Sequence, residues 1–252
     1  MTRVLFSLLL AGITTASTAT ASAATASGAT AGAADTCRQA LALGLDVSGS
    51  VDAREYRLQL AGLALALGSP AVRAALLEQP EAPVELMVYE WSGPQDQLTL
   101  VPWTRIADAA ALEAVIAGLA AVERRAEATP GTALGVAMLH GARLLEQRAQ
   151  CRRRTLDLSG DGKSNLGPRP GSVKPQLAGH GITINALVVS PEDPAGGSVR
   201  GDQTAELSAY FAAEVILGPD AFLEVARGFE DYARAMEIKL LRELDGRVLS
   251  LR

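Results

Sequence analysis

The hydrophobic positions of the chain alternate between short apolar runs and longer stretches with helical spacing. Residues 39–46 form a nearly continuous apolar run that ends in an acid, which is typical of a strand buried on both faces. Residues 52–67 then carry apolar side chains every three or four positions, which predicts an amphipathic helix. The same patterns predict further strands at 84–91, 97–103, 154–159, 182–189 and 214–217, and further helices at 106–122, 132–147, 172–180, 205–212 and 222–244.

Strands that alternate with helices predict an α/β fold with a mostly parallel sheet. The runs at 84–91 and 97–103 are separated by a short polar turn, so they predict a hairpin and one antiparallel strand at an edge of the sheet. In doubly wound sheets of this kind, ligands bind beyond the carboxyl ends of the strands. Residues that directly follow a strand are therefore the first candidates for function.

The N-terminus has the form of an export signal. Arg3 precedes a short apolar core at 4–13, and Ala21-Ser22-Ala23 offers a cleavage site for residues 1–23. An uncleaved anchor is the alternative, but the apolar run is too short to span a bilayer. Residues 24–36 are almost all Ala, Thr, Ser and Gly and predict a flexible tether before a domain at 37–252. We expect a periplasmic or secreted protein without a transmembrane segment in the mature chain.

The net charge and the cysteine content limit which partners, covalent links and metal sites are expected. The formal net charge of −5 argues against nucleic acid as a partner. The chain has two cysteines, Cys37 and Cys151, and an even number in an exported chain suggests a disulfide. With two histidines and no cysteine cluster, a zinc site is not expected.

Hard oxygen ligands follow the predicted strands or open the predicted helices at three places. They are Asp46, Ser48 and Ser50 in one segment, Thr132 in a second and Asp161 in a third. Carboxylate and hydroxyl oxygens suit Mg²⁺, Mn²⁺ or Ca²⁺. Taken singly, Ser50 and Thr132 could each cap a helix, and Asp161 could be a turn residue before a glycine.

Taken together, these residues resemble the metal-ion-dependent adhesion site (MIDAS) of von Willebrand factor A (vWA) domains. Three motifs are similar to a bacterial exported vWA-like family of unknown function: Asp-Val-Ser-Gly-Ser-Val-Asp at 46–52, Tyr-Glu-Trp-Ser-Gly at 89–93 and Ser-Gly-Asp-Gly at 159–162. The resemblance implies a three-layer, doubly wound fold over about 38–245.

The resemblance also implies a function. Ser48, Ser50 and Thr132 would ligate Mg²⁺ or Mn²⁺, with Ca²⁺ less favoured, while Asp46 and Asp161 would balance the charge of the ion. An open position on the ion would accept a Glu or Asp carboxylate from a protein partner. The chain would then be a binding module for adhesion or envelope-complex assembly and not an enzyme.

Two further expectations depend on the resemblance. Asp157 is an alternative to Asp161 as the second acid of the metal site. It lies within the apolar run, however, and is interpreted as structural. In vWA domains the strands that end at Asp46 and before Asp161 are parallel neighbours. Since Cys37 lies nine residues before Asp46 and Cys151 ten before Asp161, a Cys37–Cys151 disulfide is expected at the opposite edge.

Two alternatives stay open. A metal-dependent phosphatase or phosphotransferase could use Asp46 as the acceptor, and Lys163 is its candidate lysine. Glu90 and Trp91 end a strand on the same side as the metal and are possible partner contacts. Trp91 packed under a loop is the equally weighted alternative.

Overall fold

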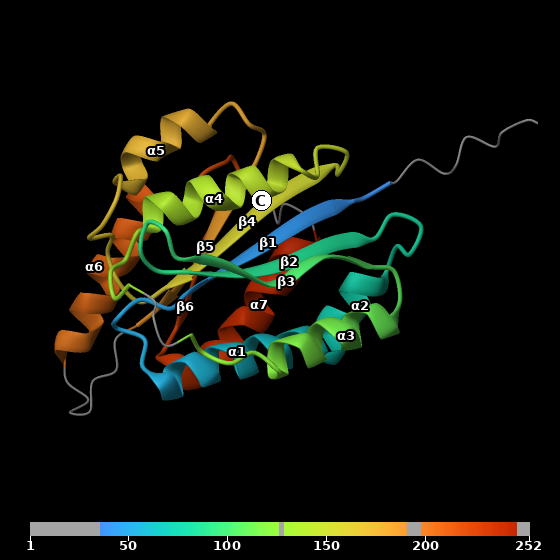
Figure 1. The fold of residues 1–252 in the computed structure, drawn as a ribbon, viewed down its shortest axis with the longest axis horizontal. Coiled ribbons are helices and arrows are strands. Elements are labelled where there is room, and N and C mark those ends of the chain that lie inside the picture. The colour runs from blue at the N-terminus through green and yellow to red at the C-terminus, as the bar shows by residue number, and fades with distance from the viewer. Residues whose placement is uncertain (1–35, 126–128, 191–197, 246–252) are drawn as a thin grey trace, which may run out of the picture. The chain divides into compact units, whose positions relative to one another are not determined.

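A six-stranded sheet in the order β3-β2-β1-β4-β5-β6 forms the centre of the domain. The computed structural model describes residues 36–125, 129–190 and 198–245 (Figure 1). β3 pairs antiparallel with β2 at one edge, and every other pairing between neighbouring strands is parallel. The strands are β1 (Gln39–Asp46), β2 (Val84–Trp91), β3 (Gln97–Ile106), β4 (Arg153–Gly160), β5 (Thr183–Val189) and β6 (Leu223–Ala226).

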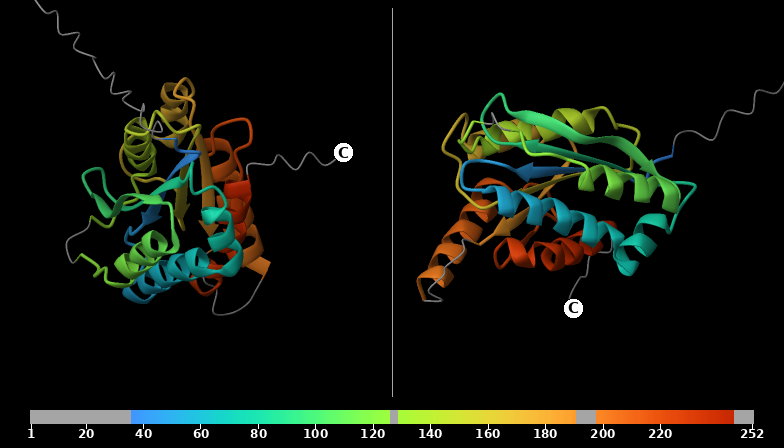
Figure 2. Two further views of the ribbon diagram at one scale, coloured as in Figure 1. Left: turned by 90° about the vertical axis from the view of Figure 1, so that its right-hand side faces the viewer. Right: turned by 60° about the horizontal axis from the view of Figure 1, so that its bottom comes forward.

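Helices cover both faces of the sheet and make a three-layer α/β fold. One face is covered by α1 (Ala53–Gly68), α2 (Pro70–Leu77), α3 (Ala109–Ala120) and α7 (Tyr232–Asp245). The other is covered by α4 (Leu134–Glu146), α5 (Pro170–Leu177) and α6 (Ser198–Glu214). α1 and α7 lie side by side on their face (Figure 2). No single helix in the described part of the chain is long and apolar enough to cross a membrane, although the bent pair of α1 and α2 together meets that test.

Alternation along the central strand separates two hydrophobic cores. Leu41, Leu43 and Leu45 belong to the core under α1, α2, α3 and α7. Ala40 and Ala42 belong to the core under α4, α5 and α6. Both faces of β1 are therefore buried, and its polar functional residues can only appear where the strand ends.

The sequence predicted the α/β class, the parallel centre and the antiparallel edge strand correctly, but several elements differ. α2 was not predicted, and the predicted strand at 214–217 is wrong. α6 ends at Glu214, and Leu217 contributes an isolated antiparallel bridge to Ile184. The sixth strand is β6, which lies inside the predicted 222–244 helix, so α7 starts ten residues later than predicted, at Tyr232. The predicted signal peptide lies outside the described residues.

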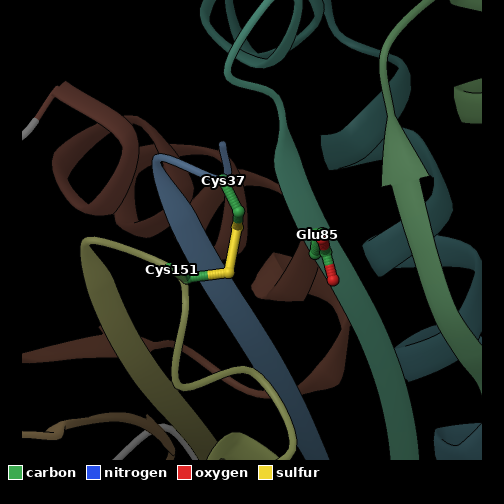
Figure 3. Close-up of side chains that lie close together, drawn as sticks. All are labelled: Cys37, Glu85 and Cys151. Atoms are coloured by element: carbon green, nitrogen blue, oxygen red, sulfur yellow. A yellow bond between two sulfur atoms is a disulfide. The ribbon is translucent and has the colours of Figure 1, made fainter. Parts of the chain in front are cut away.

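The predicted disulfide between Cys37 and Cys151 is present, with 4.5 Å between the two Cα atoms (Figure 3). It joins the segments that lead into β1 and β4, where the backbone N–H of Arg152 also donates to Cys37 O at 3.0 Å. Glu85 lies close to both sulfur atoms. The sulfurs are bonded to each other and Glu85 pairs with Arg148, so these three residues are no candidate metal site.

Candidate metal centre

The turn after β1 carries three of the predicted ligands. Asp46 is the last residue of β1 and is buried, and the backbone N–H of Ser48 donates to its Oδ1 at 2.8 Å. The Ser48 and Ser50 hydroxyl oxygens lie 3.2 Å apart. The residue that caps α1 is Asp52, whose side chain accepts from the first turn of the helix. Ser50 is therefore not the N-cap of α1, and its hydroxyl is available to a ligand.

Asp161, the residue after β4, contacts the turn after β1 from the neighbouring strand. The Ser50 hydroxyl donates to Asp161 Oδ1 at 2.7 Å, across 111 positions of sequence. The parallel pairing of β1 with β4 makes this possible because it brings both carboxyl ends to one edge of the sheet. At Gly160, a Cβ atom would lie 3.2 Å from Asp46 Oδ2 and 3.3 Å from the Phe211 ring. A glycine there allows the two acidic segments to approach each other.

Thr132 lies in a loop that is fixed to both other segments. The Gly49 N–H donates to Pro130 O at 2.8 Å, which ties this loop to the turn after β1. Asn165 binds Thr132 twice: its Oδ1 accepts from the Thr132 N–H at 2.8 Å, and its N–H donates to Thr132 O at 3.0 Å. No side chain caps α4, so the Thr132 hydroxyl does not cap that helix.

Asn165 is a positioning residue that the sequence reasoning missed. It stands four residues after Asp161, in Gly-Asp-Gly-Lys-Ser-Asn, and a polar run of this kind looks like an ordinary loop. Gln59 was missed as well. It lies on α1 as a buried polar residue, and its Nε2 donates to the Asp46 carbonyl at 3.0 Å. A polar residue on the otherwise apolar face of an amphipathic helix was the available signal.

The two carboxyl groups of the site lie in an environment that disfavours a second negative charge. Burial and, after it, the nearby Asp161 carboxylate raise the pKa of Asp46 to about 7, although hydrogen bonds from Ser48 oppose the shift. Burial also raises the pKa of Asp161. Asp46 Oδ2 is buried and has no hydrogen-bond partner of normal geometry among the described residues.

These features fit a divalent cation. A cation beside Asp46 Oδ2 would give that oxygen a partner and would favour the ionised form of both carboxyl groups. The other candidate ligands are hydroxyl oxygens, and together they make a hard oxygen set that suits Mg²⁺ or Mn²⁺. Ser50 is exposed and Asp161 is partly exposed, so the site opens to solvent on one side.

The acid that rivals Asp161 has a separate role. Asp157 points to the α7 face of β4, where its Oδ1 lies 2.7 Å from Lys239 Nζ. Lys239 also pairs with Glu243 at 2.6 Å, and all three side chains are almost fully buried. Asp157 is thus paired within the core, whereas Asp161 contacts Ser50.

Glu90 and Trp91 do not form an exposed contact surface, so that expectation is corrected. Trp91 is fully buried, because Asp46 of β1 pairs with it and the Gly160 segment lies next to its ring. Glu90 is also buried; it accepts from the Tyr56 hydroxyl at 2.9 Å and pairs with Arg125 at 2.9 Å. Both residues are therefore part of the interior. For Trp91, the alternative interpretation, a packed side chain instead of an exposed one, agrees with the structure.

The sheet order, the antiparallel edge strand and the helices on both faces define a vWA-like domain. Within that class, the chain belongs to the family described as "protein of unknown function (DUF1194)", which matches residues 36–248. A search of curated protein sequences finds no match.

Solved structures share the fold at low sequence identity. Proximal thread matrix protein 1 from the mussel byssus, in a structure with a zinc-occupied MIDAS motif, has a TM-score of 0.56 and 16% identity over 83% of this chain and 48% of that chain. A von Willebrand factor type A protein from Catenulispora acidiphila has a TM-score of 0.56 and 15% identity over 84% and 44%. The pilus adhesin SpaC from Lactobacillus rhamnosus GG has a TM-score of 0.55 and 15% identity over 84% and 30%. The chain spans less than half the length of each.

Proposed function

We propose that this protein is an exported binding module that holds Mg²⁺ or Mn²⁺ and uses the ion to bind an acidic group on a protein partner. One observation carries the proposal. Asp46, Ser48, Ser50 and Asp161 form a connected cluster at the carboxyl ends of β1 and β4, and one buried carboxylate oxygen in it has no hydrogen-bond partner of normal geometry among the described residues. The loop that carries Thr132 is bonded to the turn after β1 through Gly49 and Pro130.

The surroundings of the site favour an acidic ligand. The protein supplies only two negative charges to a divalent ion, those of Asp46 and Asp161, so a further carboxylate could bind at an open position of the ion without facing an excess of negative charge. One cationic side chain lies beside the cluster: the Arg124 guanidinium donates to Val51 O, next to Ser50. A Cβ at Gly162 would meet no atom within 4 Å, so this side of the site has space for an incoming group.

A binding role is preferred to phosphoryl transfer. The enzymatic alternative needs a lysine that faces the Asp46 carboxylate. Lys163 instead pairs with Glu206 and lies 5.9 Å from the centre of the Tyr210 ring, so its ammonium group is directed toward α6. We therefore propose that the protein does not act as an enzyme.

Export is part of the proposal. A disulfide such as Cys37–Cys151 persists in oxidising compartments, and the N-terminal residues have the pattern of a cleaved signal peptide. Mass spectrometry of the N-terminus of the protein from the cell envelope should find cleavage after Ala23. An intact Met1 in that fraction would contradict cleavage.

Calorimetric titration of Mg²⁺ and Mn²⁺ into the oxidised mature chain tests the metal site. The Ser48→Ala/Ser50→Ala double variant removes two ligands, and Ser172→Ala, an exposed serine on α5, is the matched control. We expect saturable binding in the wild type and the control, and its loss in the double variant. Equal binding in all three proteins, or none in the wild type, would overturn the proposal.

A second measurement tests the acidic partner. Mn²⁺ bound in the site enhances the relaxation of water protons, because water reaches its open position. Acetate, as the simplest carboxylate, should lower this enhancement by displacing water and should tighten Mn²⁺ binding in return. Chloride at the same ionic strength is the control. Identical effects of acetate and chloride would contradict recognition of a carboxylate.

A further inference from the structure

A cavity of about 500 Å³ lies at the end of the sheet opposite the metal site. Its polar lining is Arg38, Arg152, Arg153, Glu78, Gln79 and Asp245. Arg38 stands just before β1, whereas Asp46 ends it, so the length of the strand separates the two sites by about 26 Å. The cavity is therefore independent of the candidate metal centre.

The disulfide assembles the three arginines of this cavity. Arg38 follows Cys37, and Arg152 and Arg153 follow Cys151, so the bond places cationic segments side by side. The backbone continues this pairing, because the Arg153 N–H donates to Arg38 O at 3.2 Å. Like charges repel one another, and the covalent bond and the β1–β4 pairing oppose this repulsion by keeping the two strands together.

Two of the guanidinium groups are held in place mainly by backbone carbonyls at the ends of helices. Arg38 donates through Nη2 to the carbonyls of Ala75 and Leu76 at the end of α2, and its Nη1 lies 3.8 Å from Glu78. Its Nε is buried without a hydrogen-bond partner among the described residues. The Arg38 side chain is 7% exposed, so this donor is shielded from bulk water.

Arg153 is bound in a similar way at the end of α7. It donates to Gln39 Oε1 at 2.9 Å and to the carbonyls of Leu244 at 3.2 Å and Glu243 at 3.3 Å, all of them uncharged acceptors. Burial lowers the pKa of Arg153, the positive charge of Arg38 lowers it further, and the negative charge of Glu243 opposes both.

The third guanidinium is free. Arg152 is exposed, and it makes no side-chain hydrogen bond or ion pair with the residues that the structure describes. Three arginines against Glu78 and Asp245 give the lining a formal charge of 3 − 2 = +1. Guanidinium groups present parallel N–H donors that match the oxygens of a carboxylate or a phosphate.

We propose that this cavity binds a small molecule through an oxyanion group, a phosphate or a carboxylate, which contacts Arg152 and the inner guanidinium of Arg38. The volume lies within the range of small-molecule sites, roughly 300–1,000 Å³, so it accommodates a molecule larger than the bare anion. Arg38 and Arg153 form the inner side of the cavity and are held there by hydrogen bonds. Arg152 contacts the ligand from the solvent side.

Calorimetric titration of inorganic phosphate and of succinate into the oxidised chain, with a chelator present to remove metal ions, tests the proposal. Arg152→Gln removes the free guanidinium without touching a structural bond. Arg143→Gln, an exposed arginine on α4, removes the same charge at a distance and is the matched control. We expect saturable binding of at least one anion in the wild type and the control, weakened about tenfold in Arg152→Gln. The anion that binds more tightly identifies the ligand as a phosphate or a carboxylate compound.

Two results would overturn the proposal. One is the absence of saturable binding of both anions up to about 10 mM. The other is equal binding in Arg152→Gln and Arg143→Gln, which would show that only overall charge matters. The Ser48→Ala/Ser50→Ala variant should bind the anion as the wild type does, so the metal site and this cavity can fail separately.

Discussion

A methyl group at Gly160 would fit only tightly beside the Asp46 carboxylate. A Cβ at this position would meet Asp46 Oδ2 at 3.2 Å and the Phe211 ring at 3.3 Å, and neither neighbour can retreat easily because both are buried. The close approach is therefore a condition for the arrangement of the site, although Gly160 offers no ligand atom.

Gly160→Ala is expected to weaken Mn²⁺ binding about tenfold, the size of effect that supporting positions around metal ligands have. The methyl group would displace the Asp46 carboxylate from its position beside the Asp161 segment. Calorimetric titration of Mn²⁺ measures the change. Gly179→Ala, where a Cβ meets no atom within 4 Å, is the control and should bind Mn²⁺ as the wild type does. Unchanged affinity in Gly160→Ala would show that Asp46 is not constrained by this contact.

Candidate site residues were predictable where several side chains of the same ligand chemistry stand close together in the sequence. Asp46, Ser48 and Ser50 stand at the end of an apolar run and share hard oxygen chemistry, so the sequence predicted them as candidate ligands, and the structure brings them together. The roles of Asn165 and Trp91 were not predictable, since a loop amide and an aromatic residue at a strand end have no pattern that tells a buried position from an exposed one. Those roles depend on tertiary contacts, here with Thr132 and with the Gly160 segment.

At the scale of elements, α7 is attached to the sheet by charge as well as by apolar packing. Lys239 of α7 lies between Asp157 of β4 and Glu243 of its own helix, and Asn185 of β5 donates to Glu243 at 2.8 Å. Burying three charged groups costs free energy unless they stay paired. The network therefore specifies how α7 sits on β4 and β5.

Lys239→Met should lower the free energy of unfolding by about 3–5 kcal/mol, because it leaves two buried carboxyl groups without their cation. Urea denaturation measures the change. Lys174→Met, at a half-buried position on α5 where the ammonium group makes one hydrogen bond to Ala213 O, should change stability by no more than about 1 kcal/mol. Adding Asp157→Asn to Lys239→Met should restore part of the loss, and a further loss instead would contradict the assigned pairing.

The same network predicts how stability depends on pH in metal-free protein. Burial, together with the negative charge of Glu243, raises the pKa of Asp157 to about 7 against the opposing positive charge of Lys239. The folded chain therefore keeps a proton that the unfolded chain has lost above about pH 4. Unfolding free energy should fall as the pH rises from about 4 to about 7, by at most about 1.4 kcal/mol per pH unit for this group.

Comparison with Asp157→Asn isolates that contribution. The variant lacks the titrating group, so the difference in unfolding free energy between wild type and variant should decline over this pH range and then level off. Urea denaturation at a series of pH values, with a chelator present, measures it. Parallel curves for the two proteins would show that Asp157 does not take up a proton on folding.

Helices and strands were predictable where the hydrophobic periodicity and the length of a segment indicated the same element. They were less predictable where a local sequence signal indicated a different one. Gly68-Ser69-Pro70 reads as the end of a helix, yet Ser69 caps α2 and Pro70 takes its first turn, where proline is well tolerated. Val215-Ile216-Leu217 reads as a strand by hydrophobicity. It follows the end of α6 instead, and the edge of the sheet is completed by the four-residue β6.

At the scale of the whole molecule, one covalent bond joins the two central strands. The Cys37–Cys151 bond links residues 114 positions apart, and in the chain-entropy model a loop of this size contributes about 4–5 kcal/mol as an upper figure. Cys37→Ser/Cys151→Ser should therefore unfold at a lower urea concentration than the oxidised wild type. Reduced wild type should match the variant, and identical midpoints for oxidised and reduced protein would contradict a stabilising role.

The position of this bond also determines which part of the domain would bear mechanical load. Tension applied between residue 36 and α7 would pass from Cys37 directly into the segment before β4, so residues 38–150 would carry none of it. Asp46, Ser48, Ser50 and Thr132 all lie inside this shielded loop, and Asp161 lies outside it. In a force-spectroscopy experiment the oxidised chain should extend by about 390 Å less than the reduced chain, which corresponds to 114 residues at about 3.4 Å each. A domain that held a partner under shear would thus keep four of its five candidate ligands out of the path of the force.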